Sequence, residues 1–210
     1  MIPKVKFGYS DAYENALSKR SFKFNHKKRI AYEKVAKKFQ SRWDKVDSKI
    51  LFSMSRLTYL KWKQKEIECY LSSEAGYSYS HPLTIGYKIG WSFDYLIAFV
   101  THELSHIFFW SNKESIILPN DTKQTKNNIG FYKNYSKESY MTKLHIPVHA
   151  LVILVIKKVF GKNAEKYLKW ERWWEWSPDP SGIKGKDFKR SWEIVEKEGP
   201  ENILKQIIKR

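Results

Sequence analysis

The sequence predicts an α+β fold in which a small β-sheet packs on one buried helix, with further helices around both. Residues 91–110 are apolar on nearly every side, which is typical of a buried central helix. Residues 66–72 and 82–90 alternate apolar and polar side chains, as half-buried strands do. From residue 36 to residue 57, apolar side chains recur at intervals of three and four, the pattern of amphipathic helices.

The N-terminal half is expected to supply the sheet and its covering helices. Residues 4–10 alternate as a short strand or an extended arm would, and the helical pattern that follows is long enough for a kink, giving one or two helices. Pro82 at the start of the 82–90 strand suits an edge strand. Gly86 and Gly90, on its outer row, either leave the backbone accessible to an extended peptide or mark a bulge and the strand's end.

The C-terminal half is expected to be helical. Residues 111–139 are too polar to join a core, which predicts a mobile lid or an insertion. Residues 141–161 form a second buried helix, with Pro147 in its first turn and Gly161 as its C-cap. We predict one main domain over residues 1–176 and a C-terminal helical extension, residues 177–210, packed on the same domain.

The buried central helix, with Ser92 as its N-cap, carries His102, Glu103 and His106 in an H-E-x-x-H arrangement. Residues four apart on a helix share one face, so the two imidazoles are directed to one point. Glu103 can reach a metal-bound water without binding the metal itself. The alternative is a pair of core histidines with ordinary hydrogen-bond partners, but burying these three side chains without a ligand is costly. The arrangement therefore predicts a metal site.

A catalytic zinc ion takes three protein ligands and leaves one position for water. His145 and His149 form a second pair with the same spacing at the start of the next buried helix. We favour His149 as the third ligand, since it lies well inside that helix, over His145, which precedes Pro147. Glu138 is a weaker candidate. Two ligands from this pair would close the site and make the metal structural.

The string THELSH on a buried helix resembles the active-site helix of the zincin metallopeptidases. The order of elements is similar to the minimal zincin core and to SprT-like proteases, over residues 64–110 and more loosely over 139–160. The resemblance implies that His102 and His106 bind Zn²⁺ and that Glu103 is the catalytic carboxylate. The chain departs from the metzincins, because Phe109 and Asn112 stand where their motif continues, and no thermolysin-like Glu string follows.

The expected activity is zinc-dependent hydrolysis of a protein or peptide by an endopeptidase. Glu103 would activate a zinc-bound water, and the 82–90 strand would pair with the substrate backbone. His145, Tyr140 and Tyr135 all remain open as the group that stabilises the oxyanion.

The chain has a formal net charge of +17, and its first 45 residues hold 13 Lys and Arg against 4 Asp and Glu. Basic residues 19–45 can attract nucleic acid, an anionic membrane or an acidic protein, although a solvated helix face has the same composition. The runner-up function is therefore a nucleic-acid-associated protein with a structural metal site, or a protease coupled to DNA. An inactive binding module, with four protein ligands on the metal, is a third alternative.

Cys69 is the only cysteine, so a metal would be held by histidine and carboxylate and no intrachain disulfide can form. The apolar runs are interrupted short of about 20 residues, so we expect no membrane span. The N-terminus lacks the apolar segment of a signal peptide, which predicts a cytoplasmic location.

Overall fold

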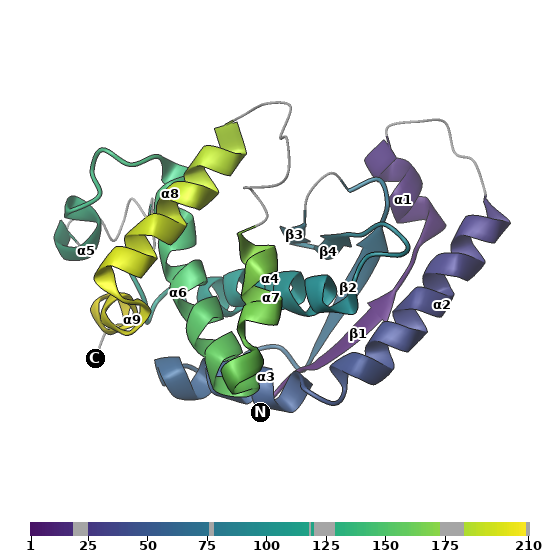
Figure 1. Cartoon of the computed structure of the whole chain (residues 1–210), viewed down its shortest axis with the longest axis horizontal. Coiled ribbons are helices and arrows are strands. Elements are labelled where there is room, and N and C mark those ends of the chain that lie inside the picture. The colour runs from purple at the N-terminus through teal and green to yellow at the C-terminus, as the bar shows by residue number, and fades with distance from the viewer. Residues whose placement is uncertain (19–24, 76–77, 118, 120–128, 173–182, 209–210) are drawn as a thin grey trace.

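The computed structural model in Figure 1 describes residues 1–18, 25–75, 78–117, 119, 129–172 and 183–208. These residues form nine α-helices, one 3₁₀ turn and a mixed sheet of four strands, which confirms the α+β class. In chain order the elements are β1 (Lys4–Gly8), α1 (Asp11–Ser18), α2 (His26–Trp43), α3 (Asp47–Thr58), β2 (Glu66–Ser72), β3 (Tyr79–Ser80), β4 (Leu83–Gly86), α4 (Phe93–Ser111), α5 (Ile129–Lys133), α6 (Tyr140–Phe160), the 3₁₀ turn Gly161–Asn163, α7 (Glu165–Glu171), α8 (Ile183–Glu198) and α9 (Pro200–Ile207).

The sheet has the strand order β1-β2-β4-β3. β1 pairs in parallel with β2, and β2 in parallel with β4, whereas β3 runs antiparallel to β4. The prediction of a strand near residues 4–10 is confirmed by β1. In β2 the apolar residues Ile67, Cys69 and Leu71 are buried, as the alternation predicted.

The prediction that residues 82–90 form the edge strand is wrong. β4 covers only Leu83–Gly86 and lies between β2 and β3, so β3 is the edge of the described sheet on this side. All four residues of β4 are buried, including Thr84 and Gly86 of the supposed outer row. The reason is that the second face is covered too: Tyr13 of α1 forms a hydrogen bond with Thr84 across 2.9 Å between the two oxygens.

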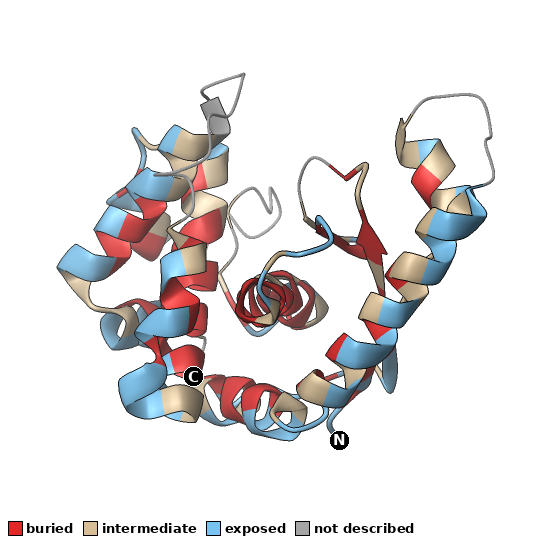
Figure 2. Ribbon diagram, turned by 45° about the vertical axis from the view of Figure 1, so that its right-hand side comes forward, coloured by how far each residue is buried: buried red, intermediate tan, exposed pale blue. Residues whose placement is uncertain are grey.

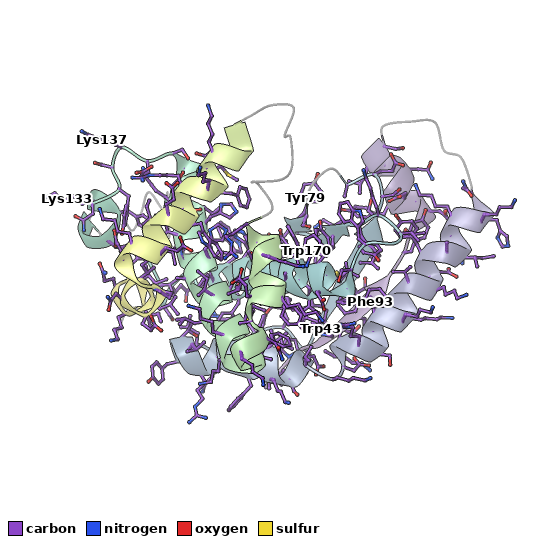
Figure 3. The ribbon with its side chains drawn as sticks, in the orientation of Figure 1. Trp43, Tyr79, Phe93, Lys133, Lys137 and Trp170 are labelled. Carbon is purple, nitrogen blue, oxygen red and sulfur yellow. The ribbon has the colours of Figure 1, made fainter. Side chains whose placement is uncertain are left out.

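The long helical pattern of the N-terminal half corresponds to two helices, α2 and α3, which are separated at residues 44–46. α2 begins behind Asn25, whose side chain accepts a hydrogen bond from the Lys28 amide at 3.0 Å. Its apolar face carries Phe39, whose ring lies 5.7 Å from that of Phe93. Trp43 at the end of α2 and Phe93 at the start of α4 lie on the same side of the fold (Figure 3).

Helix α4 lies near the centre of the fold, and most of its residues are buried (Figure 2). Ser92 caps it as predicted, accepting a hydrogen bond from the Asp94 amide at 3.1 Å. The helix contacts β3 and β4 on one side and α6 and α7 on the other. The H-E-x-x-H arrangement is therefore held between the sheet and the C-terminal helices.

Helix α6 begins at Tyr140 behind Ser139, so Pro147 lies inside the helix and not in its first turn, as the sequence had suggested. Ser139 accepts a hydrogen bond from the Thr142 amide at 3.0 Å, a cap that sets this earlier start. Gly161 is the C-cap with φ +52°, as predicted.

Helices α8 and α9 pack against α6, and their apolar residues, among them Trp192 and Ile203, are buried in the same core (Figure 1). The described part of the expected C-terminal helical extension thus consists of two helices, separated at Gly199. The boundary between residues 176 and 177 lies outside the described residues.

The prediction that residues 111–139 stay out of the core is wrong for the part that the structure describes. Ile116, Phe131 and Tyr135 are buried, and Ile116 forms a β-bridge with Ile208. The mean polarity of the segment is high, but single apolar residues within it are buried in the core. A prediction from the mean polarity therefore misses them. Lys133 and Lys137 point away from the fold (Figure 3). Residues 118 and 120–128 of this segment lie outside the described residues.

One helix of the described chain, α6 with the turn after it, is long and apolar enough to cross a membrane. This differs from the expectation of no candidate span. This segment is Tyr140–Asn163, and 61% of its most apolar stretch is buried inside the fold. The core helix of a soluble protein has the same length and composition, so this finding is weak evidence for a membrane.

Candidate metal centre

The side chains of His102, Glu103 and His106 come from the middle of α4. His102 and Glu103 are buried, with 3% and 7% of their surface exposed, while His106 is partly exposed. The ring centroids of the two histidines lie 5.1 Å apart. One turn of the central helix therefore brings two imidazoles together, as the spacing predicted.

The second histidine pair, on α6, faces this turn. The ring of His145 lies 5.4 Å from that of His102 and 4.9 Å from that of His106, between centroids. One ring nitrogen from each of these three histidines lies within 4.8 Å of the other two. The structure thus brings His145 to the H-E-x-x-H histidines.

His149 occupies a different place from the one that the sequence suggested. It groups with His102 and Glu171, whose possible ligand atoms lie within 4.8 Å of one another, and not with His106. His149 and His145 lie one turn apart along α6, so only one of them is level with His106. The geometry thus groups His145, and not the favoured His149, with His102 and His106.

Glu138, the weaker candidate, lies outside the cluster. Its carboxylate accepts two hydrogen bonds from the Arg190 guanidinium, at 2.9 and 2.7 Å. Glu138 belongs to neither of the two groups of possible metal ligands among the described residues.

Hydrogen bonds fix which nitrogen of each ring remains for a metal. His145 donates from Nδ1 to the Met141 carbonyl at 2.8 Å, and His102 donates from Nδ1 to the Glu171 carboxylate at 2.8 Å. A neutral imidazole with a proton on Nδ1 offers the lone pair of Nε2. Histidines that bind metals commonly donate their other N–H to a carboxylate or a backbone carbonyl. His102 and His145 have this arrangement.

The donor set fits zinc. Three imidazoles leave one tetrahedral position open, the composition of a catalytic zinc site. Zn–N bonds of about 2.0–2.1 Å in a tetrahedral site place ligand nitrogens roughly 3.4 Å apart. The nitrogens of the three histidines lie within 4.8 Å of one another, so a bound ion would draw them closer together.

Glu171 is the residue of this site that the sequence did not reveal. It is the last residue of α7, it is buried, and it follows Tyr167 and Leu168 on the buried face of that helix. Its spacing, three residues after Leu168 and four after Tyr167, was the available signal that it lies on the buried face of the helix. The separation of 69 positions along the chain between Glu171 and His102 concealed the pairing.

Burial and neighbouring charges shift the pKa values of the four histidines in different directions. Burial alone would lower the pKa of His102, but the Glu171 carboxylate outweighs it and holds this pKa above its usual value. Burial lowers the pKa of His145 to about 3, and it lowers the pKa values of His106 and His149 well below their usual range. The last three rings are therefore neutral near pH 7, the form in which imidazole binds metals.

Glu103 has the pKa of a general base that works near neutrality. Burial raises the pKa of its carboxyl to about 7, the positive charge on His102 opposes this rise, and the Glu171 carboxylate adds to it. General acid–base catalysis is most efficient when the pKa of the group lies near the working pH.

A cavity of about 360 Å³ opens beside His106. Its walls are mostly apolar, from α4 and α6, and the edge strand β3 contributes Ser80 to its rim. The described lining residues are Ser80, His81, His106, Phe109, Trp110, Tyr140, Leu144, Pro147 and Val148. His106 is the partly exposed member of the histidine group, so the cavity reaches the cluster at this residue.

The structure separates the three candidates for oxyanion stabilisation. Tyr135 donates its hydroxyl proton to Glu198, away from the histidines. Tyr140 lies on the cavity wall, and His145 lies within the histidine group. Tyr140 therefore remains as the candidate with a hydroxyl at the cavity.

Comparison of the chain with protein-family models, with curated proteins and with solved structures found no match.

Proposed function

We propose that this protein hydrolyses peptide bonds with a zinc ion held by His102, His106 and His145. The observation that carries the proposal is the convergence of these three rings, from two helices, beside a cavity and next to a carboxylate with a pKa of about 7. Three imidazole ligands and one open position support a catalytic site over a structural one.

A bound zinc ion lowers the pKa of a coordinated water and polarises a carbonyl oxygen. Glu103 accepts the proton that the water loses as its oxygen attacks the peptide carbonyl, and then donates that proton to the leaving amine. While Nδ1 of His102 donates to Glu171, that bond orients the ring and leaves Nε2 for the metal.

The substrate proposed for this site is an extended peptide with a large apolar side chain. The apolar walls of the cavity would hold that side chain. The open edge of β3, which borders the cavity at Ser80, replaces the 82–90 strand as the backbone partner in this proposal.

Glu103→Gln tests the proposed role of the carboxylate. The variant should bind zinc as the wild type does, since Glu103 is not among the grouped ligands, and its kcat should fall at least about 10³-fold on an unfolded-protein substrate. Zinc content and hydrolysis are measured on the same sample. Hydrolysis at the wild-type rate by a zinc-loaded variant would refute the assignment.

Nucleic-acid binding is a second candidate function, favoured by α2. Lys34, Lys37 and Lys38 are exposed on this helix and form no ion pair with other described residues. Unpaired lysines along one helix attract phosphate groups. Residues 19–24 of the basic segment lie outside the described residues.

A further inference from the structure

A second group of possible metal ligands lies behind the first, away from the cavity. It consists of His102, His149 and Glu171, and one possible ligand atom from each lies within 4.8 Å of the other two. All three side chains are buried, with 3%, 0% and 5% of their surface exposed. None of them lines the cavity beside His106.

Only one oxygen of the Glu171 carboxylate accepts a hydrogen bond from the described residues. Oε2 accepts the hydrogen bond from His102, but Oε1 is buried and accepts no hydrogen bond from any described residue. A buried carboxylate oxygen without a partner costs free energy. A cation between Glu171 and His149 would remove that cost.

A hydrogen bond from Nδ1 orients the His149 ring for binding a metal, as it does for His102 and His145. Ser191 donates its hydroxyl proton to the Phe188 carbonyl at 2.8 Å, so its oxygen accepts from His149 Nδ1 at 3.1 Å. This leaves Nε2 as the nitrogen with a lone pair. Phe188 and Trp192 of α8 pack on the ring at 5.9 and 5.4 Å between centroids and keep it in place.

His102 belongs to both groups but cannot serve both at once. A neutral imidazole carries one N–H and one lone pair. When Nδ1 donates to Glu171, Nε2 is the nitrogen offered to His106 and His145. When the proton moves to Nε2, Nδ1 becomes the ligand atom on the side of Glu171.

We propose that His102, His149 and Glu171 form a second position for a divalent cation, which competes with the His102–His106–His145 position for His102. The donor set of two imidazoles and one carboxylate suits a first-row transition ion such as Zn²⁺, Co²⁺ or Fe²⁺. Which position is filled follows the tautomer of one ring. The inference depends on the histidine cluster and not on peptide hydrolysis.

The test removes the first position and measures what remains. The apoprotein of His106→Ala/His145→Ala is titrated with Zn²⁺ and with Co²⁺ by calorimetry and by visible absorption. We expect this double variant to bind one ion, because His102, His149 and Glu171 remain. Adding Glu171→Gln should weaken binding more than about 100-fold, beyond the 10- to 100-fold that loss of an outer hydrogen bond to a ligand typically costs. Adding His149→Ala should do the same.

The matched control adds Glu165→Gln, which changes an exposed carboxylate on the same helix α7 and should leave the affinity of the double variant unchanged. If the double variant does not fold, His106→Ala alone, with and without Glu171→Gln, gives the same comparison. Equal affinities with and without Glu171→Gln would overturn the second position. Wild-type protein should bind one ion, and two ions per chain would overturn the competition for His102. Since neither readout uses hydrolysis, an inactive protein leaves this test intact.

Discussion

His102 connects every part of the candidate site. Its ring lies within 5.4 Å, between centroids, of three other imidazoles, and its Nδ1 is bonded to Glu171. Four histidine rings this close together, three of them buried, would be costly to keep charged. Low pKa values keep three of them neutral, and a carboxylate compensates the fourth. The cluster is consequently an arrangement that a cation can enter without displacing many protons.

Replacing each α6 histidine separately tests which one acts as the third ligand for hydrolysis. His145→Ala should lower kcat/KM more than about 100-fold, because loss of a ligand exceeds the cost of losing an outer hydrogen bond. His149→Ala should retain activity within about tenfold, since His149 does not group with His106. Steady-state hydrolysis of one peptide by both zinc-loaded variants is the measurement. The opposite ranking would make His149 the third ligand.

At the residue scale, the sequence predicts what is local and misses what depends on packing. The spacing of His102 and His106 fixes their common face, and the structure brings their rings to 5.1 Å between centroids. The choice between His145 and His149 depends on where α6 crosses α4. The spacing of residues within one helix gives no information on that crossing. Glu171 meets His102 only because α7 packs against α4, which the sequence does not contain.

Among the elements, α1 is attached to the sheet by one buried carboxylate. Glu14 accepts hydrogen bonds from Ser72 and from the amide and hydroxyl of Ser73, at 3.0 and 2.6 Å for the latter two, and it forms an ion pair with Lys28 of α2 at 2.7 Å. Burial alone would raise the pKa of Glu14, but the hydrogen bonds from Lys28 and the two serines outweigh it and hold this pKa below 4.5.

Glu14→Gln should lower the free energy of unfolding by about 2 kcal/mol at pH 7, because hydrogen bonds to a charged group are replaced. The stabilisation by Glu14 is present above the unfolded pKa near 4.5 and is lost as the pH falls through the lower folded pKa. Urea unfolding at pH 7, 4 and 3 measures both effects. The variant should lose less stability in acid than the wild type.

Glu33→Gln is the matched control for this prediction. Glu33 pairs with Arg29 on the exposed face of α2, at 2.8 Å, and an exposed ion pair contributes little to stability. If Glu14→Gln and Glu33→Gln have the same stability at pH 7 and the same acid dependence, the account of Glu14 is wrong.

For whole elements, periodicity predicted the central helix, β2 and the N-terminal helices. It failed where a second layer covers a strand. The outer row of β4 reads as exposed from alternation, but Tyr13 of α1 lies over Thr84. Periodicity also put Pro147 in the first turn of α6, whereas it lies inside the helix. The reason is that the cap at Ser139 starts the helix before the apolar run begins.

In the molecule as a whole, the positive charge is a property of the surface and says nothing about the fold. On α2, Arg29 and Lys28 are paired with acidic neighbours, whereas Lys34, Lys37 and Lys38 are not paired with described residues. The sequence indicated a basic segment, and the structure shows which of its described lysines remain available.

Lys34→Glu/Lys37→Glu/Lys38→Glu tests nucleic-acid binding through α2. If the helix binds phosphates, DNA affinity should fall, and the slope of log K against log salt should decrease by about 2 or more. Fluorescence anisotropy with duplex DNA over a salt series is the measurement. The control Lys157→Glu/Lys158→Glu/Lys162→Glu makes the same change of charge at exposed residues elsewhere. Equal losses in the two variants, or no binding by the wild type at low salt, would remove this function.

X-ray absorption at the zinc edge, on the wild-type protein loaded with one equivalent of Zn²⁺, tests the central claim most directly. We predict three imidazole nitrogens at about 2.0 Å and one further light ligand, and we predict that His145→Ala reduces the imidazole count. A wild-type site with fewer than three imidazoles, or a spectrum that His145→Ala leaves unchanged, would contradict the assignment of His102, His106 and His145 as the zinc ligands.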